Sequence, residues 1–288
     1  MRPRRALPLL LALALCATAG CTGVFGTDHT APSFAPGVST ERVTNATALA
    51  HAHRAVLANT SYTYAANATQ RLGENYTATY LTREWIATNG SFRYRGRSVV
   101  ENGDHRSDSL SGVWTNGSIA LRRTVNVSNG TVTYTRFRPQ APLPVPNATR
   151  TRIRQVFVGP NTTVTRTQNA SGHAFATVVA NESRTSRTAL ANGTITNVTR
   201  DRRANATVRS DGLVPELDVS ERGYRPFPGA NGSVRYSDES HVRYAGLGST
   251  VVGRPPWVET ALNATAGLRY GEKTAPRSWN GSAENAST

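Results

Sequence analysis

A two-residue alternation of apolar and polar side chains is the feature that most constrains the fold. It begins near Ser61 and is interrupted by Asn-Gly pairs at positions 89, 102, 116 and 129. Successive side chains of a strand point to opposite faces of a sheet, and Asn-Gly between alternating runs indicates a tight hairpin turn. The pattern therefore predicts an antiparallel meander. An apolar content of 38% suits a sheet with one solvated face.

The second half of the chain carries a weaker form of the same pattern. It predicts hairpins that pair 163–168 with 173–179, 204–209 with 213–219, and 233–236 with 241–244. Residues 151–158 suit either a short helix or a strand. Apolar residues are sparse from Glu182 to Thr199, which predicts a long, irregular excursion.

One helix is expected before the strands. From Thr40 to Asn59 the apolar residues follow a period of 3.6, with Ser39 or Thr40 available as a cap. Together these patterns predict an α+β, mostly β fold. It consists of a large curved antiparallel sheet, an open half-barrel, with one main N-terminal helix on its concave face.

The N-terminus has the layout of an export signal. Arginines at 2, 4 and 5 precede an apolar run from Ala6 to Ala17, and Ala-Gly-Cys follows at 19–21. Twelve helical residues span about 18 Å, too short for roughly 30 Å of hydrocarbon. The Cys21 site looks like a lipobox, although Thr18 stands where Leu or Val is usual. The alternative is an ordinary secretory signal that leaves a free thiol, and the export route, general or twin-arginine, stays open.

The lipobox interpretation sets the expected organisation and location. Residues 1–20 would be a lipoprotein signal peptide, 21–39 a flexible tether, 40–270 a single β-rich domain and 271–288 a disordered tail. The mature protein would be exported and held on the outer face of the cytoplasmic membrane by lipid on Cys21. Two acyl chains, the usual number on such a cysteine, anchor a protein stably.

Asparagine is distributed in an unusual way. Of 20 asparagines, 19 begin an Asn-x-Ser/Thr triplet, whereas Ser and Thr fill 59 of 288 positions and chance predicts about four. Such triplets accept N-glycans in exported chains. The same residues also form turns, which accounts for Asn89 and Asn116. The candidate glycosylation sites are Asn45, Asn67, Asn75, Asn126, Asn147, Asn161, Asn197, Asn205 and Asn263.

The net charge is +15, and Arg supplies all but one of the 33 cationic residues. Arginines recur at every second position, as at 93, 95 and 97, and so share one strand face. The simplest interpretation is a solvated sheet face. A second is contact with acidic polysaccharide, and a third is neutralisation by acidic glycans on the chain itself. Nucleic acid is not an expected partner.

Four short motifs are spread over residues 47–262: the Leu57–Thr63 run after the helix, Asp211–Val214, Val234–Asp238 and Arg254–Trp257. Together they resemble an uncharacterised family of haloarchaeal surface lipoproteins. By implied fold, such proteins are similar to LolA-like lipoprotein carriers, open half-barrels whose concave face holds acyl chains. The strongly basic composition departs from the acidic one usual in salt-adapted proteins.

Residues for catalysis or metal binding do not assemble in the sequence. His51 and His53 are two apart, so they diverge on a helix, and no metal site or cofactor is expected. The run Asp238-Glu239-Ser240-His241 is interpreted as a solvated hairpin tip. No catalysis is predicted. The predicted role is a non-catalytic surface protein that binds a lipid, with an envelope component contacting acidic polysaccharide as the alternative. Six aromatic residues are candidates to line the ligand pocket: Tyr64, Tyr80, Trp85, Phe92, Trp114 and Tyr134.

Overall fold

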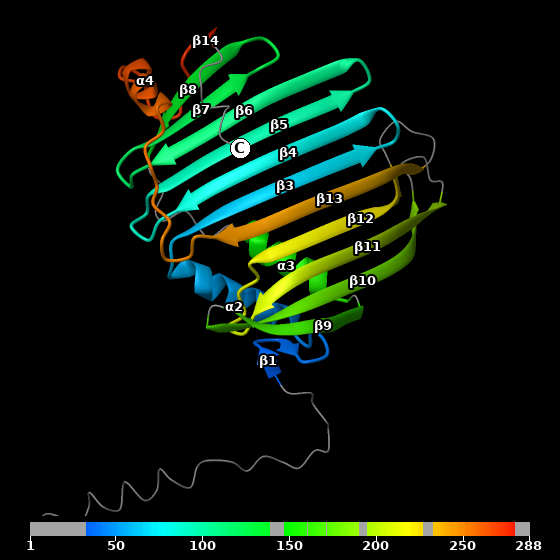
Figure 1. The fold of residues 1–288 in the computed structure, drawn as a ribbon. Coiled ribbons are helices and arrows are strands. Elements are labelled where there is room, and N and C mark those ends of the chain that lie inside the picture. Colours follow the sequence, from blue (N-terminus) through cyan, green and yellow to red (C-terminus); the bar gives the residue numbers. More distant parts are fainter. Residues whose placement is uncertain are drawn as a thin grey trace, which may run out of the picture. The chain divides into compact units, whose positions relative to one another are not determined.

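The computed structural model describes residues 33–138, 147–159, 161–170, 172–189, 195–226 and 233–279. Within them, one large antiparallel sheet carries three helices (Figure 1). The helices are α2 (Ala46–Ala58), α3 (Asn147–Phe157) and α4 (Trp257–Ala264). The mostly β fold class with a curved, open sheet is therefore confirmed.

The sheet has twelve strands in the order β14-β8-β7-β6-β5-β4-β3-β13-β12-β11-β10-β9. The first half comprises β3 (Tyr62–Leu72), β4 (Tyr76–Ile86), β5 (Phe92–Asn102), β6 (His105–Thr115), β7 (Ala120–Asn126) and β8 (Thr131–Phe137). The second half comprises β9 (Asn161–Ala170), β10 (His173–Ala189), β11 (Ile195–Arg209), β12 (Glu216–Pro226), β13 (Ser233–Ala245) and β14 (Arg277–Ser278). A separate pair, β1 (Ser33–Ala35) and β2 (Val38–Ser39), precedes them.

The predicted meander is present in two runs, and a long-range pairing joins them. Strands β3 to β8 follow one another outward, and β9 to β13 return so that β13 pairs with β3, with Val242 opposite Ala66. The Asn-Gly turns place glycines with positive φ at 90, 103, 117 and 130, as such hairpins require.

The sequence misplaced two features of the second half. The stretch 182–199 is predicted as an irregular excursion, but its described residues, 182–189 and 195–199, lie in the long strands β10 and β11, whose register runs unbroken from Phe175 to Ala189. Residues 233–244, predicted as a hairpin, form the single strand β13, which pairs on both sides. In both places the structure is determined by pairing between strands, which the pattern of neighbouring residues along the sequence does not predict.

Helix α2 begins later than predicted. Asn45 caps it by accepting a hydrogen bond from the Ala48 N–H at 2.9 Å. The preceding residues are used elsewhere, because the Gly37 carbonyl accepts the N–H groups of Thr44 and Asn45. The described elements also begin before residue 40 and continue past 270, where Lys273 and Arg277 pair with β8.

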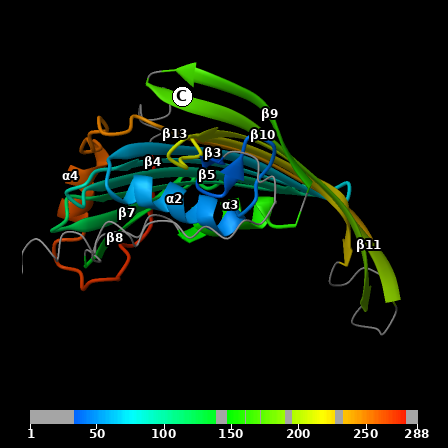
Figure 2. The ribbon, with the colours of Figure 1, turned by 90° about the horizontal axis from the view of Figure 1, so that it is seen from below.

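The two faces of the sheet carry separate cores. Helices α2 and α3 lie on the side toward which β10 and β11 curve (Figure 2), and Leu49, Leu57 and Ile153 join the core there. Helix α4 packs through Trp257 on β6 to β8. Cross-strand register puts Trp114 and Leu121 of this second core on the opposite, convex face. Figure 1 likewise shows α4 in front of the sheet and α3 behind it.

Candidate functional site

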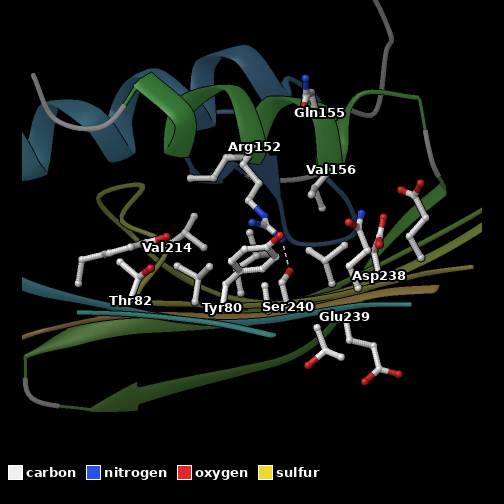
Figure 3. Close-up of a pocket in the computed structure, with 18 of the residues that line it drawn as sticks. Tyr80, Thr82, Arg152, Gln155, Val156, Val214, Asp238, Glu239 and Ser240 are labelled. Carbon is white, nitrogen blue, oxygen red and sulfur yellow. Dashed lines mark hydrogen bonds between the residues drawn. The ribbon is translucent and has the colours of Figure 1, made fainter. Parts of the chain in front are cut away.

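A cavity of about 890 Å³ lies between α3 and the concave face of the sheet (Figure 3). Strands β3, β4, β11, β12 and β13 form its floor, and α3 covers it with Arg152, Ile153, Gln155 and Val156. Ligand pockets typically occupy roughly 300–1,000 Å³. The cavity is therefore large enough for a lipid-sized molecule.

The lining changes character along the strands. Where β12 begins and β13 ends, it is apolar, with Val214, Leu217 and Val242. Where β12 continues and β13 begins, it is charged, with Glu221 opposite Asp238. A site with an apolar end and a charged end suits an amphiphile rather than a wholly polar or wholly apolar ligand.

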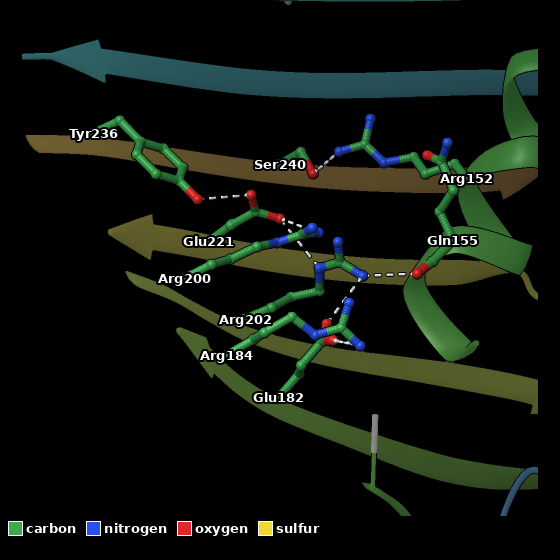
Figure 4. Close-up of polar contacts among 9 residues, drawn as sticks. All are labelled: Arg152, Gln155, Glu182, Arg184, Arg200, Arg202, Glu221, Tyr236 and Ser240. Atoms are coloured by element: carbon green, nitrogen blue, oxygen red, sulfur yellow. Dashed lines mark hydrogen bonds and ion pairs between the residues drawn. The ribbon is translucent and has the colours of Figure 1, made fainter. Parts of the chain in front are cut away.

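Arg202 on β11 is the centre of an ionic network at the charged end (Figure 4). Its guanidinium lies 3.1 Å from Glu221 and 3.6 Å from Glu182, and it donates to the Gln155 carbonyl at 2.7 Å. Arg200 binds Glu221 at 2.8 Å. This network attaches α3 to the floor of the cavity, because Gln155 belongs to the helix and the charged partners to the sheet.

Two further polar groups face α3 from β13. Ser240 accepts a hydrogen bond from Arg152, and one carboxylate oxygen of Asp238 is buried without a hydrogen-bond partner among the described residues. Buried acceptors are normally satisfied. A ligand with a hydroxyl or amide at this position would supply the missing donor.

Glu84 introduces an acid into the apolar part of the site. It lies on β4 directly between Tyr64 of β3 and Tyr94 of β5. Burial raises the pKa of the Glu84 carboxyl to about 7. Burial, together with Glu84, also raises the pKa of the Tyr64 hydroxyl. Near neutral pH, Glu84 is thus balanced between a neutral and a charged form.

The six predicted pocket aromatics are not brought together. Tyr64 and Tyr80 line the cavity. Phe92 has the same strand parity as Tyr94 but is not among the lining residues. Trp85 follows Glu84 directly and so faces the convex side, where Trp114 and Tyr134 belong to the second core.

The functional residues that sequence reasoning missed are Glu84, Arg152, Arg202 and Glu221. Of these residues, only Glu84 could have been identified from the sequence, because it is a charged residue with the same strand parity as Ala78, Tyr80 and Ile86 on the inward face of β4. The others depend on α3 meeting β11 to β13, which no local pattern indicates.

The run 238–241 is not a hairpin tip. It lies inside β13, and Figure 3 shows Asp238 and Ser240 on the α3 side with Glu239 on the other. His241 alternates with Ser240 and binds Asp218 at 2.6 Å on the convex side. Ser240 and His241 therefore point to opposite faces and do not form a nucleophile–base pair.

The histidines of α2 also diverge. His53 is buried and accepts a hydrogen bond from the Val214 N–H at 3.0 Å, while His51 is exposed. Burial lowers the pKa of His53 to about 4. Among the described residues, no three His, Cys, Asp or Glu side chains are grouped as metal ligands would be.

The predicted modification sites are placed as follows. Cys21 lies outside the described residues, as do the side chains of Asn147 and Asn197. The remaining candidate asparagines all have exposed side chains: Asn45, Asn67, Asn75, Asn126, Asn161, Asn205 and Asn263. In the described part of the chain no helix has the length and apolar character needed to cross a membrane.

No protein-family model matches the chain, and no curated protein matches it. Several solved structures match it at low identity and low TM-score. The crystal structure of LprF from Mycobacterium bovis matches with 9% identity and a TM-score of 0.34, over 75% of this chain and 99% of that one. A DUF1329 family protein from Desulfovibrio piger matches with 12% identity and a TM-score of 0.23, over 74% and 94%.

A LolA superfamily protein from Nitrosomonas europaea matches with 9% identity and a TM-score of 0.20, over 74% of this chain and 96% of that one. The haloarchaeal resemblance stays a prediction.

Proposed function

We propose that this chain is an exported, lipid-anchored, N-glycosylated surface protein that binds an amphiphilic lipid without catalysis. The observation that carries the proposal is the cavity of about 890 Å³ between α3 and the concave sheet. It has apolar walls at one end and fixed charges at the other. We propose further that the ligand is an acyl or prenyl chain with a polar head group.

The lining supports one orientation of such a ligand. The apolar chain would lie toward Leu217 and Val242, where burying it removes apolar surface from water. The head group would lie toward Arg152, Ser240 and Asp238, which offer both donors and an acceptor. A negatively charged head group would lie near Arg152, and its hydroxyl near Asp238.

The proposed lipid anchor and the proposed glycans are inferred from the sequence. A lipid on Cys21 would hold the domain outside the cytoplasmic membrane, and the seven exposed candidate asparagines would be accessible there to a glycan-transferring enzyme. A lipid-binding domain held at a membrane surface has its ligand source close by.

Native mass spectrometry of the full chain, extracted from its own membranes in mild detergent, tests the ligand. The expected result is a species heavier than the apoprotein by one lipid in addition to the anchor. Ala68, on β3 between Tyr80 and Ser240, faces the cavity. Ala68→Phe would fill the cavity floor and is expected to remove the extra mass.

Ala68→Ser is the matched control, because it changes the same side chain without filling the space. It should retain the lipid. A wild-type protein that carries no lipid beyond the anchor contradicts the proposal. So does an Ala68→Phe variant that folds normally by circular dichroism and keeps the lipid.

A further inference from the structure

The convex face of the sheet carries a groove of about 660 Å³ that the lipid proposal does not use. It runs over β13, β3, β4 and β5, and α4 does not cover it. Its lining combines apolar residues, among them Leu81, Leu110 and Val127, with a set of arginines and tryptophans: Arg83, Arg93, Arg95, Arg97, Arg243, Trp85 and Trp279. The groove and the concave cavity lie on opposite faces of the sheet, so a ligand in the groove does not depend on lipid in the cavity.

Cross-strand register places several of these arginines in one transverse row. Arg83 of β4 lies directly opposite Arg95 of β5, and Arg243 of β13 shares the row across Ala65 of β3. Like charges directly opposite each other destabilise a sheet. The row is therefore an arrangement that folding alone does not favour.

Two of the nearby carboxylates bind other arginines. On this face, strands β4 to β6 carry Glu101 and Asp108, and strands β12 and β13 carry Glu216, directly opposite Arg243, and Glu239. Asp108 binds Arg97 through two bonds of 3.1 and 2.6 Å, and Glu101 binds Arg106 at 2.8 Å. The guanidinium beside Asp108 also holds the pKa of that carboxyl below its usual range. Asp108 and Glu101 thus balance Arg97 and Arg106. The row itself places three arginines, Arg243, Arg83 and Arg95, in line with one carboxylate, Glu216, so its formal charge is positive.

Trp85 fixes the orientation of two of the guanidiniums. Arg93 lies 4.6 Å and Arg83 5.4 Å from the centre of its ring. A guanidinium stacked on an aromatic ring still presents its N–H edge. That edge forms paired hydrogen bonds with a carboxylate or sulfate. The groove is thereby preorganised for oxyanions.

The spacing points to a polymer. Arg243 and Arg95 are separated by three strand intervals, about 14 Å in total, which exceeds the reach of a single small oxyanion. The imidazole of His241 also lines the groove and can form hydrogen bonds with sugar hydroxyls. We propose that this groove binds an anionic polysaccharide, one whose sugar units carry carboxylates or sulfates, supplied from outside the chain.

Isothermal titration of the full chain with a defined sulfated oligosaccharide, repeated at low and high salt, tests the proposal. The expected result is binding that weakens steeply as salt rises. Arg83→Gln and Arg95→Gln should each weaken binding by about tenfold, the effect of losing one charge-assisted hydrogen bond. Arg71→Gln is the control, since Arg71 has the same strand parity on β3 but does not line the groove.

Three outcomes would overturn the inference. The first is binding that does not respond to salt. The second is an equal loss of affinity in Arg71→Gln and Arg95→Gln, which would reduce the effect to net charge. The third is tighter binding of single-stranded DNA with the same number of charges, which would make the groove a general polyanion site.

Discussion

Glu84 is the residue whose surroundings most directly predict a measurable property. Its pKa is about 7 in the folded chain because it is buried, against 4.5 normally. Between these values the folded state binds more protons than the unfolded state, so the free energy of unfolding falls as pH rises. The full loss, about 3 kcal/mol, is reached above pH 7. Glu84→Gln should therefore be more stable than wild type at pH 8 and similar to it at pH 4.

Urea unfolding at several pH values, with wild type and variant side by side, measures this difference. The pKa of His53 is lowered to about 4, so His53 decreases the free energy of unfolding as pH falls below 6.5. Because this effect is the same in wild type and variant, it cancels in the difference between them. Glu101→Gln, an exposed carboxyl on β5, serves as the control. If Glu84→Gln and wild type keep parallel pH profiles, Glu84 does not titrate as described.

Strands and helices could be predicted where a pattern of neighbouring residues in the sequence defines them. The Asn-Gly turns define the hairpins from β4 to β8, and a 3.6 period defines α2. By contrast, residues 182–189 and 195–199 become strand because β10 and β11 pair with each other. Their alternation is hidden by polar and charged residues such as Glu182 and Arg202, which face the cavity network instead of an apolar core.

Arg202 joins four elements, and its removal tests how they hold together. Its side chain is 10% exposed, and it pairs with Glu182 and Glu221 while donating to α3. Arg202→Met leaves two partly buried carboxylates with less compensation. The expected loss is roughly 3 kcal/mol in the free energy of unfolding, measured by urea titration.

Arg184→Met provides the comparison, because Arg184 also pairs with Glu182, at 3.3 Å, but its side chain is 65% exposed. Exposed pairs contribute roughly 0–1 kcal/mol. Equal losses in the two variants would mean that Arg202 acts as an ordinary surface charge and does not secure α3.

At the scale of the whole molecule, the cavity could not be predicted from the sequence, although several of the strands that line it could. The cavity requires β13 to lie beside β3 and α3 to lie across β11 to β13. These are contacts between residues far apart in the chain. The alternation of apolar and polar residues predicts which side chains share a face of the sheet. It does not predict that Tyr64, Arg152 and Leu217 line one cavity, or that Trp114 and Trp257 belong to one core.

Two of the candidate glycosylation sites also stabilise the fold through their side-chain oxygens. Asn45 and Asn126 each use their side-chain oxygen to accept a backbone N–H, at 2.9 and 3.2 Å. An N-linked glycan attaches to the amide nitrogen, so it leaves these two bonds in place. Glycosylation is therefore compatible with the capped helix and the β7–β8 turn.

The proposed attachment to the membrane depends on one thiol, that of Cys21. Lipid joins such a protein through the cysteine sulfur, so Cys21→Ser should leave export intact and release the glycosylated protein into the medium. Cell fractionation followed by intact-mass measurement of the released and membrane-bound forms checks both parts. The wild-type N-terminus should begin at Cys21 with the mass of a two-chain lipid added. Treatment with a glycan-releasing enzyme should then lower the remaining mass. A Cys21→Ser protein that stays with the membrane, or a wild-type Cys21 with no added mass, would show that another feature holds the protein there.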